Sequence, residues 1–251
     1  HATGFHSQMW RPMAEDLVTD FHVVAMDTRG HGESGRPNDG SFAWSGLAAD
    51  ILAVIDALGL ASVRAVGHSS GGAALLLAEQ ARPGTFERLW LYEPILFPPA
   101  SSDGPPPPNV MAEAALRRRG WFPNLHQALA NYQSKPPLRD VDPAILRAYV
   151  EHGFRAADDG VALKCTPEDE AAVFAEARSH DGYQRLIEVR CPVTITGGED
   201  SDISPSLMRR IADQLPDGQA QILPGKGHLL PFEEPLLVAS LIRAAMQPAA
   251  T

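Results

Sequence analysis

Ser69 lies between two glycines in the run Gly67-His68-Ser69-Ser70-Gly71, a pattern typical of an activated serine. The apolar segment Ser62–Val66 before it predicts a strand, and the alanine- and leucine-rich segment Gly72–Ala81 after it predicts a helix. At a sharp strand-to-helix turn, the glycines remove Cβ atoms that would collide. The hydroxyl then projects from the backbone, and the first amides of the helix face the same point. We therefore predict Ser69 as a nucleophile, the alternative being an ordinary glycine-rich turn.

A serine nucleophile needs a base, and His228 is the best candidate. It ends the glycine-rich run Gly225-Lys226-Gly227-His228, which follows a predicted strand at Gln219–Leu223. His68 adjoins the serine, but neighbours at such a turn are expected to point apart, and we expect His31 to be structural. Three more histidines belong to the middle of the chain, where they are surface groups or pocket lining: His126, His152 and His180.

The base in turn needs a carboxylate to orient it. The loop Gly197–Asp202 follows another predicted strand. In open sheets of parallel strands, functional residues lie in the loops at the carboxyl ends of the strands. We predict Asp200 as this acid and Asp202 as the runner-up. Glu93, at the end of the predicted strand Leu89–Tyr92, is a third option. The alternative for Gly197–Asp202 is a polar loop that caps the next helix.

The elements that must position these side chains alternate along the chain. We predict strands at 21–26, 62–66, 89–92, 192–196 and 219–223, and helices at 7–17, 47–58, 72–81, 205–215 and 236–246. Short links between them favour an α/β fold with a mostly parallel sheet covered by helices on both faces. Residues 97–187 interrupt the pattern with predicted helices at 112–118, 125–132, 143–151 and 168–177, and no convincing strand. We therefore predict a core domain formed by 1–96 and 188–251, with a helical insertion at 97–187.

Composition narrows the possible partners. The 251 residues are 44% hydrophobic and carry a net charge of −10, which argues against binding nucleic acid or an anionic membrane. No apolar run approaches the roughly 20 residues of a membrane-spanning helix. Cys165 and Cys191 lack metal-ligand spacing and suggest a reducing compartment, such as the cytoplasm. The sequence leaves the oligomeric state open.

The order Ser69, then Asp200 or Asp202, then His228 resembles that of the α/β-hydrolase superfamily. The resemblance covers nearly the whole chain and rests on five segments: His1–Gly4, Asp27–Ser34, Gly67–Gly72, Gly197–Asp202 and Gly227-His228. One departure from the family pattern is Ala2, where the family usually has glycine. Another is the spacing of the acid loop, since counting from Gly197 favours Asp200, whereas counting back from Pro205 gives a position between Asp200 and Asp202.

The resemblance implies further site residues. The backbone amides of Thr3 and Ser70 would hold the oxyanion, and residues 97–187 would form a lid over the site. Aromatic residues of this lid are candidates for substrate binding, or they only hold the lid together: Trp121, Phe122, Tyr132, Tyr149 and Phe154. Relatives also place a buried strand before the segment that begins here at His1. We therefore expect further residues upstream in the natural protein, on the order of 20–30.

The predicted function is hydrolysis of a small carboxylic ester through an acyl-serine intermediate, a reaction that needs no metal or cofactor. One alternative is C–C bond hydrolysis of a diketone-type substrate with the same residues. Another is a ligand-binding receptor that keeps this fold with little turnover.

Overall fold

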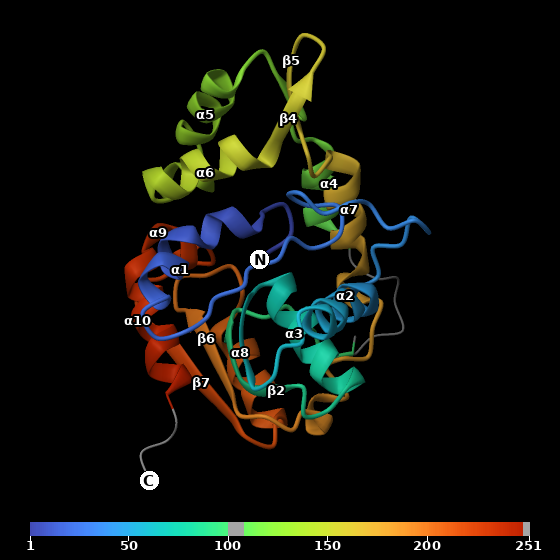
Figure 1. Ribbon diagram of the computed structural model, residues 1–251, viewed down its shortest axis with the longest axis vertical. Helices are drawn as coiled ribbons and strands as arrows, with labels where there is room; N and C mark the ends of the chain where they lie inside the picture. Colours follow the sequence, from blue (N-terminus) through green and yellow to red (C-terminus); the bar gives the residue numbers. More distant parts are fainter. Residues whose placement is uncertain (100–107, 248–251) are drawn as a thin grey trace.

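The computed structural model describes residues 1–99 and 108–247, and its centre is a four-stranded parallel sheet (Figure 1). The strands lie in the order β1-β2-β6-β7. Their bounds are β1 Val63–His68, β2 Phe86–Tyr92, β6 Val193–Gly198 and β7 Gly218–Leu223. Each neighbouring pair is parallel. The predicted α/β fold with a mostly parallel sheet is confirmed.

Helices cover both faces because alternate side chains of the strands point to opposite sides. In β2, Leu89 and Leu91 join the core cluster on the side of the first set of helices, whereas Trp90 and Tyr92 join the other. The first set is α2 Trp44–Ala57, α3 Ser70–Ala81 and α8 Pro205–Gln214. The second is the 3-10 helix η1 Ser7–Trp10, with α1 Arg11–Leu17, α9 Leu230–Glu233 and α10 Pro235–Met246.

The expectation that 97–187 contains no strand is wrong. Three short strands form a separate antiparallel sheet in the order β3-β5-β4. They are β3 Trp121–Phe122, β4 Phe154–Ala157 and β5 Gly160–Leu163. With two to four residues each, they are too short to show an alternating pattern in the sequence.

The described part of this segment also contains helices, and α5, α6 and the hairpin β4–β5 project away from the main sheet (Figure 1). The helices are α4 Val110–Leu116, α5 Leu125–Gln133, α6 Pro143–Gly153 and α7 Pro167–Ala175. Short 3-10 helices are η2 Leu138–Asp140, η3 Glu176–Arg178 and η4 Leu186–Glu188. Side chains of Asn124, Asp142 and Thr166 accept hydrogen bonds from the first turns of α5, α6 and α7. Such caps stabilise a helix by about 1 kcal/mol each. Residues 100–107 of the predicted insertion lie outside the described residues.

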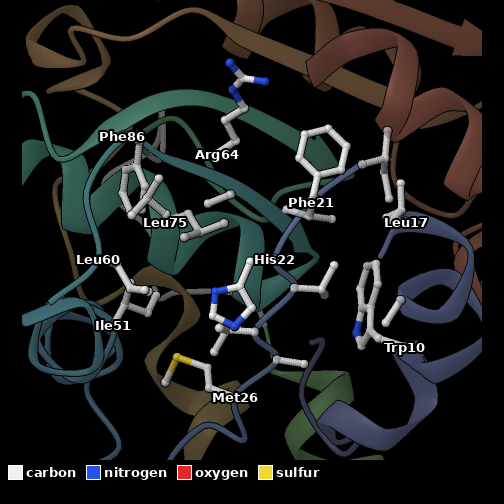
Figure 2. A pocket seen from close by; sticks show the side chains of 18 of the residues that line it. Trp10, Leu17, Phe21, His22, Met26, Ile51, Leu60, Arg64, Leu75 and Phe86 are labelled. Atoms are coloured by element: carbon white, nitrogen blue, oxygen red, sulfur yellow. The ribbon is translucent and has the colours of Figure 1, made fainter. Parts of the chain in front are cut away.

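The strand expected at Phe21–Met26 does not form. This segment and the edge strand β1 both line a groove of about 610 Å³ (Figure 2). In the described part of the chain, residues 22–26 make no backbone–backbone hydrogen bonds. A strand needs a hydrogen-bonded neighbour at about 4.8 Å. The groove lies between Phe21–Met26 and β1, so the two segments do not pair. Phe21–Met26 has a strand-like composition, but it remains extended and unpaired.

Among the described residues, no helix combines the length and apolar character needed to cross a bilayer.

Candidate active site

Ser69 occupies the turn between β1 and α3. Its backbone has φ 56° and ψ −120°, a conformation that costs about 1–3 kcal/mol and is typical of functional sites. The flanking glycines are required by close approach. A Cβ on Gly67 would lie 2.7 Å from the Gly72 Cα, and one on Gly71 would lie 2.6 Å from the carbonyl oxygen of His1. The strained turn therefore has the geometry expected for a projecting serine.

The imidazole of His228 pairs with Glu93. His228 follows β7 and Glu93 follows β2, and His228 Nδ1 lies 2.5 Å from Glu93 Oε2. Glu93 adopts φ 44° and is fully buried. Its carboxylate also accepts hydrogen bonds from the Gly198 amide at 2.8 Å and the Ser201 hydroxyl at 2.7 Å. The carboxylate is therefore fixed by three partners before any substrate arrives.

Asp200 and Asp202, the predicted acids, are both exposed, and neither contacts His228. The loop after β6 instead supplies hydrogen-bond donors to Glu93. Gly198 permits this arrangement, because a Cβ there would lie 2.1 Å from the carbonyl oxygen of Lys226. Our choice of Asp200 as the partner of His228 is thus corrected to Glu93, which sequence reasoning ranked third.

His68 lies nearer the site than expected. Its ring is fully buried, 4.7 Å from the His228 ring between centroids, and both of its nitrogens lack hydrogen-bond partners within the described residues. Burial lowers the pKa of His68 well below its usual value. His68 is therefore neutral near pH 7 and does not repel a positive charge on His228.

No hydrogen bond joins the hydroxyl of Ser69 to His228 in the described part of the chain, so this pair is open in the structure. Such contacts often tighten only when substrate binds. The loop that carries His228 is itself held in place, because the Tyr92 hydroxyl donates to the carbonyl oxygen of Gly227 at 2.7 Å.

The segment His1–Gly4, here termed the N-terminal loop, lies beside Ser70. The Thr3 hydroxyl donates to the Ser70 hydroxyl at 2.9 Å, and both residues are buried. The backbone N–H groups of Thr3 and Ser70 donate to no acceptor among the described residues. Ser70 is the first residue of α3, where N–H groups lack partners within the helix. Two amides close to Ser69 are therefore free to bind an anionic oxygen.

The imidazole of His31 contacts this loop at Gly4. Its Nε2 accepts a hydrogen bond from the Gly4 amide at 3.0 Å, and its Nδ1 lies 3.0 Å from the carbonyl oxygen of Arg29. The ring must therefore be neutral, with its proton on Nδ1. Burial lowers the pKa of His31 to about 4. The structural role expected for His31 agrees with these contacts.

We expect acid to weaken the fold through His31. Because its folded pKa is lower than its unfolded pKa, the unfolded chain binds the proton first. The contribution of neutral His31 to the free energy of unfolding is complete above pH 6.5 and is lost as the pH falls toward 4. The measurement is urea unfolding of wild type and of His31→Gln at pH 6.5 and pH 5. Between these two pH values, the free energy of unfolding should fall by about 2 kcal/mol more for wild type than for His31→Gln. His126→Gln, on an exposed side chain, is the control. Parallel pH curves for wild type and His31→Gln would contradict this expectation.

Four of the five predicted substrate-binding aromatics are buried. Phe122, Tyr132, Tyr149 and Phe154 are buried and contact one another, with ring centroids 5.2–6.4 Å apart. Trp121 is 41% exposed and lies on β3. This placement favours the interpretation that the four buried rings hold the segment together.

The three histidines of residues 97–187 form no hydrogen bond with Ser69 within the described residues. His126 is exposed on α5, His152 lies 6.4 Å from the His6 ring, and His180 stacks on Trp44 at 5.4 Å. Within 1–99 and 108–247, no group of three or more His, Cys, Asp or Glu side chains is placed to hold a metal ion. Both cysteines are free and buried.

Comparison with known proteins places this chain among the alpha/beta hydrolases. The model of the alpha/beta hydrolase family matches residues 1–241. The putative carbamate hydrolase RutD of Caulobacter sp. (strain K31) is 26% identical over 233 residues, which cover 90% of this chain and 80% of that protein. N-formylmaleamate deformylase of Pseudomonas putida is 27% identical over 234 residues, covering 90% and 78%. The crystal structure of E-2-(acetamidomethylene)succinate hydrolase has the same fold, with a TM-score of 0.81 at 21% identity and coverage of 98% and 89%.

Proposed function

Because this chain belongs to the α/β-hydrolase family, we propose that it is a serine hydrolase with Ser69, His228 and Glu93 as its catalytic triad. The hydrogen bond between His228 Nδ1 and the buried Glu93 carboxylate is the observation that carries this proposal. A buried carboxylate against Nδ1 fixes the tautomer that leaves Nε2 unprotonated and basic. The strained turn at Ser69 supplies the matching nucleophile.

In the proposed reaction, Ser69 Oγ attacks the carbonyl carbon of the substrate while His228 Nε2 takes the hydroxyl proton. The protonated His228 then gives this proton to the leaving group, and an acyl-Ser69 intermediate remains. Water, deprotonated by His228, attacks the acyl carbon; the bond from this carbon to Ser69 Oγ then breaks, and His228 returns the proton to Oγ as the acid leaves. Glu93 stays ionised and stabilises the imidazolium that forms twice in the cycle.

The amides of Thr3 and Ser70 would stabilise the negative oxygen of each tetrahedral intermediate. Two observations support this role: among the described residues neither backbone amide donates to an acceptor, and the hydroxyls of Thr3 and Ser70 are joined by a hydrogen bond. A donor of this kind contributes about 10²–10³ to kcat. Ala2 in place of the family's usual glycine changes the residue before Thr3 but leaves the Thr3 amide available.

Residues 97–187 would serve as the lid over this site, and the core domain would comprise 1–96 and 188–251. This proposed lid packs on the N-terminal segment of the core, because Tyr149 of α6 contacts both Phe5 and His6. In this assignment Trp121 is the candidate aromatic that remains open to a ligand, since it is exposed and the other four candidate rings are buried against one another.

The proposed substrate is a small carboxylic acid derivative, and its leaving group is either an alcohol or an amine. An ester is the simplest substrate for a triad of this type. The names of two relatives favour the second possibility, cleavage of a C–N bond in a carbamate or an N-formyl amide. Both reactions use the same acyl-serine chemistry, so the two proposals differ only in the leaving group that His228 protonates.

A substrate panel tests this proposal. Purified protein should be assayed against p-nitrophenyl esters of graded chain length, small carbamates, N-formyl amides and diketones. We expect turnover of short acyl substrates, with kcat/KM decreasing as the acyl chain grows. Cleavage restricted to carbamates and N-formyl amides would select the C–N reaction, and cleavage of diketones alone would contradict the proposal. Ligand binding without turnover of any substrate would favour a receptor.

A further inference from the structure

A buried ion pair joins four segments of the proposed lid. Arg118, just after α4, pairs with Glu170 of α7, and its side chain also donates to the hydroxyls of Tyr149 on α6 and Tyr132 on α5. The side chains of Arg118 and Glu170 are only 22% and 8% exposed. None of these groups takes part in the proposed mechanism.

The pair rests directly on the N-terminal loop. Gly4 has φ +80°, and a Cβ at this position would lie 2.6 Å from Glu170 Oε1 and 3.1 Å from Arg118 Nη1. On its other side, the Gly4 amide donates to His31. The Gly4 backbone is therefore held between a core histidine and the ion pair of the lid.

Tyr149 adds a second contact, between the lid and the two residues that follow the N-terminal loop. Its hydroxyl accepts from Arg118, and its backbone carbonyl accepts from His6 Nε2 at 3.1 Å. Its ring stacks on His6 with an interplanar angle of 4°, and its edge contacts Phe5. Through Glu170 and Tyr149, Arg118 is thus connected to residues 4–6, immediately after Thr3.

Lid stability alone does not require an ion pair here. Two buried charges lose hydration, and apolar side chains of similar volume often stabilise a fold equally well. A charged pair differs in directionality, because a guanidinium forms several hydrogen bonds of fixed geometry at once. That property suits a group that must hold a backbone in one position.

We propose that Arg118 and Glu170 are positioning residues that hold the N-terminal loop, and with it the Thr3 amide, in the geometry that binds the oxyanion. This inference rests on the proposed serine hydrolase function. Packing of the lid on the core would thereby contribute to the geometry of the oxyanion site. If Arg118 is replaced, the loop keeps its hydrogen bonds to Ser70 and His31 but loses its contact with an ordered ion pair of the lid at Gly4.

The test compares Arg118→Met and Arg118→Lys with Arg117→Met. Arg117 is the matched control, because its side chain is 70% exposed and lies 3.9 Å from Glu113. The first measurement is hydrogen–deuterium exchange of a peptide covering residues 1–6, which does not depend on activity. We expect Arg118→Met to exchange about tenfold faster there, Arg118→Lys to be intermediate because lysine lacks the fork, and Arg117→Met to match wild type.

The second measurement is the rate of labelling by a fluorophosphonate, together with kcat and KM on the best substrate of the panel. We expect Arg118→Met to lower labelling and kcat by about 10- to 100-fold with little change in KM, since the lost interaction acts in the transition state. Unchanged exchange at residues 1–6 in a folded Arg118 variant would overturn the proposal. If Arg118→Met does not fold, Arg118→Lys decides. If wild type itself is not labelled, the proposed function fails and the exchange result alone decides the positioning role.

Discussion

Ser69→Ala should fold as wild type does, yet lose all labelling by a fluorophosphonate and nearly all turnover. Alanine lacks only the hydroxyl oxygen that would form the acyl bond, and it can take the same backbone conformation. Removing the nucleophile of a comparable triad lowers kcat by about 10⁶-fold. Intact-protein mass spectrometry after labelling, with circular dichroism to check folding, measures both parts of this expectation.

Ser70→Ala is the matched control for this experiment. Ser70 contributes its backbone amide to the proposed oxyanion site, and this amide survives the substitution. We expect Ser70→Ala to be labelled at Ser69, because only the hydrogen bond from Thr3 is lost. Labelling that persists in Ser69→Ala and disappears in Ser70→Ala would transfer the nucleophile to Ser70.

Glu93→Gln should lower kcat by about 10⁴-fold, the scale seen when the triad acid of a serine protease is replaced by its amide. The amide group of glutamine can present an N–H to His228 Nδ1 and so stabilise the unreactive tautomer. Its volume is nearly that of glutamate, so its oxygen can still accept from the Gly198 amide, while the Ser201 hydroxyl, which shares Oε2 with His228, would accept from the new NH₂ group. Steady-state kinetics on the best substrate of the panel gives the ratio directly.

Asp200→Asn is the control that separates the two acid assignments. Asp200 is exposed, and its amide donates to the carbonyl oxygen of Lys226, a contact that the substitution preserves. We expect its kcat to stay within about threefold of wild type, as is usual for a surface change away from the reacting groups. A larger loss in Asp200→Asn than in Glu93→Gln would return the role to the loop after β6.

The position of the acid illustrates how this architecture tolerates change. β2 and β6 are neighbours in the sheet, so the loops at their carboxyl ends reach the same space beside His228. The positive φ of Glu93 turns the chain out of β2, and the side chain of glutamate is one methylene longer than that of aspartate. The loop after β6 then contributes the Gly198 amide and the Ser201 hydroxyl as partners of the acid. The loops after β2 and β6 thus hold the acid together.

The sequence by itself determined the features that depend on local contacts. Gly67 predicted the strained turn, because the collision of a Cβ there with Gly72 of the next helix is decided within a few residues, whereas Gly71 is required by the distant carbonyl oxygen of His1. Periodic apolar positions predicted the helices that flank the sheet, and the motifs predicted the family, which is confirmed. The strands that found a neighbour in the sheet were also predicted close to their observed bounds.

Only the tertiary structure decided what depends on distant partners. Glu93 and His228 are separated by 135 residues, and their contact follows from the order β2-β6-β7, which no local pattern encodes. Phe21–Met26 has the composition of a strand but lacks a hydrogen-bonding partner, whereas β3, β4 and β5 are very short yet pair. The support of Gly4 by Arg118 and Glu170 likewise needs the lid folded onto the core. In each case the deciding free energy comes from pairing between segments, and the sequence of one segment does not contain it.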